Sequence, residues 1–94
     1  MIKLELEEFV EEIKAEMYGY EEIEEAMIND WEDRFRAWVA KVQDKKIKND
    51  RIKFGPNSIK VELKDETDIF KIVDKFLVAV THNEIDKYFI DWRL

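Results

Sequence analysis

Several residue types that carry protein chemistry are absent or rare in this chain of 94 residues. Cysteine is absent, which excludes disulfides, thiol catalysis and cysteine-ligated zinc. With two glycines the chain cannot form a glycine-rich phosphate-binding loop. No apolar run approaches the roughly 20 residues that cross a bilayer, and charge follows Met1 almost at once, so no signal peptide is expected. These absences favour a cytoplasmic protein.

Catalysis and metal binding find little support among the remaining residues. Nucleophilic catalysis needs a hydroxyl beside a base, but the only serine, Ser58, ends a turn sequence, and the only histidine, His82, lies in a helix-start sequence. No glutamate stands three residues before His82, and neither glycine has the spacing of a calcium loop. The sequence therefore predicts a protein that is not an enzyme and that holds no metal and no cofactor.

The apolar residues nevertheless suffice for a folded domain. They make up 46% of the chain and include twelve aromatics, most of which a disordered acidic chain would lack. Trp31, Phe35 and Trp38 recur at spacings of four and three and are predicted core residues. Tyr88 and Trp92 are predicted to be either core residues or partly exposed binding anchors.

The spacing of apolar residues changes along the chain from helix period to strand period and back. Spacings of three and four predict helices over about 4–17, 21–46, 66–80 and 82–92. The second is either one helix or two, because Asn29-Asp30 can cap a new start. Thr81 and Glu84 match a capping box at the start of the last helix.

Apolar and charged residues alternate over 50–64, on both sides of Gly55-Pro56-Asn57-Ser58. This pattern predicts a β-hairpin, which must lay its apolar face on helices to be stable. We therefore predict one α+β domain over 1–94, with the element order α-α-β-β-α-α and the hairpin packed on amphipathic helices.

Charge is sorted along the chain rather than scattered. Residues 1–33 contain thirteen acids and two bases, residues 34–60 contain nine bases and two acids, and residues 61–94 contain eight acids and five bases. The net charge is −7. Because the field of a surface governs which partners a small protein meets, the acidic and the basic segment are the two candidate interaction surfaces.

The first candidate surface is a row of glutamates on the first predicted helix. Glu8, Glu12 and Glu16 recur every four residues and stack along one side, and with their neighbours they place about one charge per 3 Å of helix axis, close to a nucleic-acid strand. A solvated helix face is the alternative interpretation, since acids suit a helix start, but Glu16 lies near the helix end. The predicted partner-binding residues are Glu5, Glu8, Glu12, Glu16, Glu21, Glu22, Glu24 and Glu25.

The second candidate surface is basic and comprises Lys41, Lys45, Lys46, Lys48, Arg51 and Lys53. If the first two helices form an antiparallel pair, Glu5 and Glu8 are expected opposite Arg34 and its neighbours, and lysines beyond about Lys41 extend past the first helix. These bases could pair with the acids, within one chain or between two chains, or bind phosphate. The negative net charge opposes binding to nucleic acid.

In size, acidity and lack of catalytic residues, the chain resembles the small inhibitors that bacteriophages encode against host defences, including anti-CRISPR and anti-restriction proteins. This resemblance implies a DNA-mimicking decoy. We therefore predict an inhibitor that docks its glutamates on a basic, nucleic-acid-binding surface of a larger protein, in the cytoplasm of a host if viral, without membrane or direct nucleic-acid contact. The alternatives are an assembly protein that forms homodimers or larger oligomers and, less favoured, a nucleic-acid-binding module that uses Lys41–Lys60.

Overall fold

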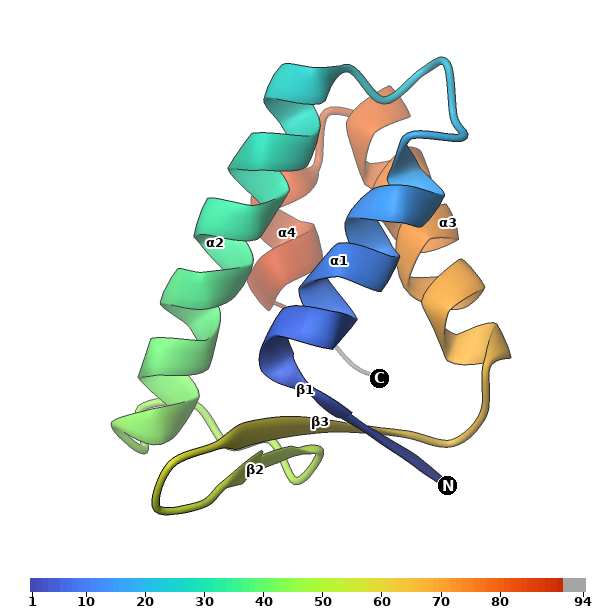
Figure 1. Ribbon diagram of the computed structural model, residues 1–94. Coiled ribbons are helices and arrows are strands. Elements are labelled where there is room, and N and C mark those ends of the chain that lie inside the picture. The colour runs from blue at the N-terminus through green and yellow to red at the C-terminus, as the bar shows by residue number, and fades with distance from the viewer. Residues whose placement is uncertain (91–94) are drawn as a thin grey trace.

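The computed structural model describes residues 1–90, and within them the predicted α+β fold is confirmed. Four helices lie on one side of an antiparallel sheet of three strands, ordered β1-β3-β2 (Figure 1). The predicted order of two helices, a hairpin and two helices is present, preceded by one strand that the prediction lacks.

That additional strand is β1 (Ile2–Glu5), where the first predicted helix was expected to begin at residue 4. Ile2 and Leu4 alternate with Lys3 and Glu5, and β1 pairs antiparallel with β3 so that Leu4 lies opposite Val61. Four residues are too few for the alternation to stand out against the helical spacing that follows. Pairing with a strand nearly sixty residues away decides their conformation.

The first two helices form the frame of the domain. α1 (Leu6–Met17) ends just before Gly19, as predicted. α2 (Glu25–Gln43) starts later and ends earlier than the predicted range 21–46, and it runs unbroken through Asn29, so no new helix starts there.

The end of α2 is set by its backbone geometry. Lys45 adopts a left-handed φ of 62°, and the amide of Lys46 donates to the carbonyl of Lys41 (2.9 Å). This is a Schellman ending, which usually places glycine where this chain has Lys45.

The predicted hairpin is confirmed as β2 (Ile52–Phe54) and β3 (Ile59–Leu63). Its turn is closed by the amide of Gly55, which donates to the carbonyl of Ser58 (2.8 Å). Ile52 and Val61 lie opposite each other and are buried beneath the helices.

The last two helices are α3 (Thr67–Thr81) and α4 (Ile85–Ile90). The capping box predicted at Thr81 is wrong, because Thr81 is the last residue of α3. Asn83 has a left-handed φ of 55°, and the amide of Glu84 donates to the carbonyl of Ala79 (2.8 Å). The segment is therefore a helix ending of the same type as that of α2, and Trp92, expected in the last helix, lies outside the described residues.

Aromatic rings from α1 and α2 form the centre of the core, and the predicted core residues Trp31, Phe35 and Trp38 are all buried. The rings of Trp31 and Phe35 stack at 4.9 Å. The Trp31 indole N–H donates to the Tyr88 hydroxyl (3.3 Å), and this hydroxyl donates to the carbonyl of Ile72 (3.2 Å). Tyr88 is thus partly buried against the core, with its hydroxyl bonded inside the protein.

Candidate functional site

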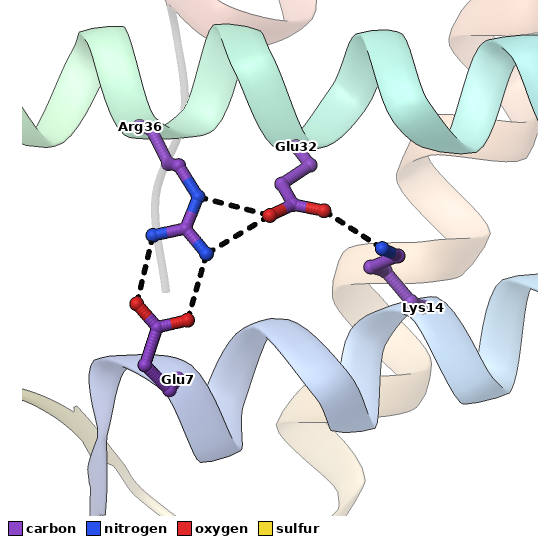
Figure 2. Close-up of polar contacts among 4 residues, drawn as sticks. All are labelled: Glu7, Lys14, Glu32 and Arg36. Atoms are coloured by element: carbon purple, nitrogen blue, oxygen red, sulfur yellow. Dashed lines mark hydrogen bonds and ion pairs between the residues drawn. The ribbon is translucent and has the colours of Figure 1, made fainter.

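Some of the acidic and basic side chains hold α1 and α2 together. Arg36 of α2 forms two parallel hydrogen bonds with the Glu7 carboxylate of α1, at 2.7 and 3.0 Å (Figure 2). Arg36 also donates to Glu32 (2.9 Å), which accepts a further bond from Lys14 Nζ (2.7 Å). The two helices are therefore joined by a chain of four alternating charges.

These contacts shift the proton affinities of the four groups. The hydrogen bonds from Arg36 hold the pKa of Glu7 below its ordinary value, and those from Lys14 and Arg36 do the same for the pKa of Glu32. In return, the carboxylates raise the pKa of Lys14 and of Arg36. All four side chains therefore stay charged around neutral pH and are occupied within the protein.

Glu5 and Glu8, expected opposite Arg34 and its neighbours, form no ion pair with Arg34 or with Arg36. Arg34 instead pairs with Asp30 one turn away (2.8 Å) and with Asp86 of α4. Glu5 belongs to β1, where its carboxylate lies 3.8 Å from the Lys60 ammonium across the sheet. From the first turn of α1, Glu7 pairs with Arg36 instead, because α1 begins at Leu6 and its first turn lies opposite the middle of α2.

The glutamates left over form what we call the acidic row: Glu8, Glu11, Glu12 and Glu16, all on α1. In residues 1–90 none of them has an ion pair, and all but the half-buried Glu16 are exposed. Four carboxylates over nine residues, or about 13.5 Å of helix axis, is one charge per about 3.4 Å, the axial spacing of phosphates along one DNA strand. Removing the occupied Glu5 and Glu7 therefore lowers the predicted density only slightly, from one charge per about 3 Å.

The other predicted acids continue the row beyond the end of α1. Glu21, Glu22 and Glu24 lie in the connection from α1 to α2, and Glu25 begins α2. All four are exposed. They sit at the end of the molecule farthest from the sheet, where the connection between α1 and α2 lies (Figure 1).

The basic surface lies at the opposite end of α2. Lys41, Lys45, Lys46 and Lys48, here called the basic end, are exposed, and no ion pair involves them in the part of the chain that the structure describes. The 19 residues of α2 separate them by about 28 Å from Glu25. The acids of one end therefore cannot neutralise the lysines of the other within one molecule.

Two residues of the predicted basic surface behave differently from the lysines. Arg51 is half-buried, and its guanidinium lies 3.6 Å from the carboxylate of Asp68, so it is occupied. Lys53 is exposed on the sheet, opposite Lys60 of β3.

Asp68 is a structural residue that the sequence patterns did not single out. It is 4% exposed and accepts a hydrogen bond from the backbone amide of Lys64 (2.7 Å), which joins the end of β3 to the start of α3. An aspartate in the first turn of a predicted helix was the available signal.

One flank of the acidic row borders a groove between α1 and α3. The groove has a volume of about 490 Å³ and opens above β1. Its apolar lining includes Ile2, Leu4, Leu63, Ile69 and Phe70, and its acidic lining is Glu12, Glu16 and Glu66. Phe70 is 49% exposed.

The candidate catalytic and metal-binding residues are not brought together. Ser58 lies in the hairpin turn beside the sheet, and His82 follows the end of α3 that points away from the sheet (Figure 1). Among residues 1–90, no group of three or more histidines and acids is placed to hold a metal ion. Nor is any helix in this range long and apolar enough to span a membrane.

Comparison with known proteins returns no relative: no protein-family model, no curated protein and no solved structure matches this chain. Its function must therefore be argued from its own surfaces.

Proposed function

We propose that the protein is a non-enzymatic inhibitor that docks on the basic, nucleic-acid-binding surface of a larger protein and competes with nucleic acid for it. The acidic row carries this proposal. Its carboxylates have the linear density of a DNA strand and no cation of their own among the described residues. A groove that binds phosphates would meet the same charge pattern on this helix.

The physical cost of the acidic row supports a role in binding. Glu8, Glu12 and Glu16 repel one another along α1, at a few tenths of a kcal/mol for each i,i+4 pair. Glu16 also lies in the last turn of the helix, where the helix dipole disfavours an acid. The nearby Lys14 forms its ion pair with Glu32 on α2 and not with Glu16. Phage-encoded inhibitors of host defence, which the chain resembles in size and acidity, would use such a surface.

Charge reversal on the acidic row tests the proposal. The affinity-tagged protein is used to capture proteins from a nuclease-treated cell lysate, beside a variant with Glu8→Lys, Glu12→Lys and Glu16→Lys. We expect the wild type to retain a nucleic-acid-binding protein that added duplex DNA displaces, and the variant to lose it. Capture should also weaken as salt rises, because exposed charges are screened.

A matched control reverses three exposed acids elsewhere: Asp44→Lys, Asp50→Lys and Glu84→Lys. This control has the same net charge as the variant with Glu8, Glu12 and Glu16 reversed. If the position of the charges decides binding, the control should capture the partner as the wild type does. Equal capture by all three proteins, or a captured protein that DNA does not displace, would contradict the proposal.

A second candidate function is self-assembly, and the separation of charge along α2 favours it. The basic end and the acids Glu21–Glu25 lie at opposite ends of that helix, so they can neutralise each other only between molecules. Sedimentation velocity at about 20 mM and 500 mM salt decides, because the Debye length changes several-fold over this range. Assembly predicts oligomers that dissociate in high salt, whereas a monomer under both conditions excludes it.

A further inference from the structure

The groove between α1 and α3 extends the acidic row into a surface of mixed character. Its floor is built from apolar side chains of both β1 and β3, Ile2, Leu4 and Leu63, and its α3 wall ends in Phe70. In the part of the chain that the structure describes, the charged groups beside these apolar side chains are all carboxylates: Glu12 and Glu16 on the α1 side and Glu66 on the α3 side. A plain nucleic-acid mimic would not need an apolar groove beside its charges.

Phe70 shows that the groove is open to a partner. Half of its side chain is exposed, although α3 buries Ile69 and Ile72 on either side of it in the sequence. Partly exposed aromatic side chains beside a cavity are the usual anchors of protein interfaces. The volume of about 490 Å³ falls within the range of pockets that enclose a ligand group and admits one or two inserted side chains.

The charge of the lining decides what kind of occupant fits. Among residues 1–90, three carboxylates and no base line the groove, so an acidic segment or a phosphate would be repelled. An arginine or lysine fits on both counts, because its hydrocarbon stem can cover the apolar floor while its charged head meets the carboxylates. A second copy offers such a pair in its hairpin, where Lys53 precedes Phe54, which is 38% exposed.

We propose that this groove receives an extended or helical segment of the partner protein that carries an apolar side chain flanked by arginine or lysine. The inference rests on the proposed function, since the same partner contacts the acidic row, and it adds a requirement for an apolar anchor beside the basic surface. The groove then supplies specificity, while the acidic row supplies attraction at a distance.

Three capped six-residue peptides test the inference against the isotope-labelled full chain by NMR titration. One alternates arginine and leucine, the second arginine and serine, and the third glutamate and leucine. We expect the arginine–leucine peptide to shift the amide signals of β1, of Glu12–Glu16 and of Glu66–Phe70. The other two peptides should bind at least about tenfold more weakly, as expected when an anchor or its charge partners are lost.

Variants locate the binding. Phe70→Ser should lower the affinity for the arginine–leucine peptide about tenfold. The double variant Glu12→Gln, Glu16→Gln should lower it as well. Val78→Ser is the matched control, since Val78 is 56% exposed on the same helix and lies outside the groove. Thermal unfolding of each variant shows that it is folded.

The outcomes separate the two proposals. Equal binding of the arginine–serine and arginine–leucine peptides would overturn the inference that the groove receives an apolar anchor, and it would leave the proposed function standing. Binding that depends on Phe70, together with a failed capture experiment, would retain the groove and overturn the decoy. If the NMR signals of the groove residues shift with protein concentration alone, a second copy of the chain occupies the groove, and the inference is overturned. It is also overturned if the glutamate–leucine peptide binds as tightly as the arginine–leucine peptide, because the charge of the peptide then does not matter.

Discussion

Replacing Glu32 by glutamine tests the charged chain between α1 and α2. Glu32 is the central acceptor: its side chain is 23% exposed and binds Lys14 Nζ at 2.7 Å and Arg36 at 2.9 Å. Glutamine keeps the shape and one acceptor oxygen but removes the charge that compensates both cations. The variant therefore isolates the electrostatic part of the contact.

The magnitude follows from the burial of the group. An exposed ion pair contributes about 0.2–1 kcal/mol and a hydrogen bond to a charged group about 1.5–3 kcal/mol. Glu32 is partly screened and has two cationic partners, so we expect Glu32→Gln to lower the free energy of unfolding by about 1–2 kcal/mol. For a domain of this size, that lowers the melting temperature by about 5–12 °C.

The pH dependence gives a second signature. The hydrogen bonds from Lys14 and Arg36 hold the pKa of Glu32 below its ordinary value of 4.5. A lowered pKa in the folded state stabilises the protein above the unfolded pKa, and this contribution is lost as the pH falls through the folded pKa. The difference between wild type and variant should thus shrink as the pH falls from 7 towards about 3.

The assay is thermal unfolding followed by circular dichroism across this pH range. Asp33→Asn is the control, because Asp33 is adjacent and exposed, and it has no ion pair in residues 1–90. Its effect should stay below about 0.5 kcal/mol. Equal effects of the two substitutions, or a Glu32→Gln loss that does not change with pH, would refute the reasoning.

Three further substitutions test local features. Lys45→Gly should raise the free energy of unfolding by about 0.5–1 kcal/mol in denaturant titration, because Lys45 has a left-handed φ that glycine adopts without strain. An unchanged free energy of unfolding would show that the left-handed conformation of Lys45 costs nothing. Asp68→Ala should lower the free energy of unfolding by about 1–3 kcal/mol, since the Lys64 amide loses its acceptor, and a neutral effect would contradict this. Tyr20→Phe removes the hydroxyl that donates to Asp74 (2.8 Å) and should lower the free energy of unfolding less than Asp68→Ala does, because this bond is exposed. The hydrogen bond to the Asp74 carboxylate also raises the pKa of Tyr20, so alkaline absorbance titration should show this pKa lowered when Asp74 is replaced by asparagine.

Helix endings show where local patterns mislead. The stretch from Thr81 to Glu84 matches a capping box, yet it ends α3, because Asn83 takes up the left-handed conformation that closes a helix. Likewise α2 stops at Gln43 although lysines with good helix propensity follow. Both sequences permit either outcome, and the path of the chain to the next element selects one.

The charged residues show a similar division. Their sorting into acidic and basic segments is visible in the sequence, and so is the four-residue recurrence of Glu8, Glu12 and Glu16. The sequence does not show which acids remain without an ion pair. Glu7 pairs with Arg36, which is 29 positions away, and Glu5 pairs with Lys60 on the neighbouring strand. Ion pairing depends on distances between elements, which one-dimensional spacing does not contain.

What the sequence by itself determined is the four helices, the hairpin and their buried faces, since apolar periods of 3.6 and 2 are local properties that survive in any arrangement. The aromatic core on α2 and the hairpin both follow from it. Only the tertiary structure decided that Ile2–Glu5 is a strand, that Tyr88 packs against the core, and that Ile2, Leu63 and Phe70 meet beside Glu12 and Glu16. Those contacts join residues up to about sixty-eight positions apart, and their energy is gained only when the whole chain is folded.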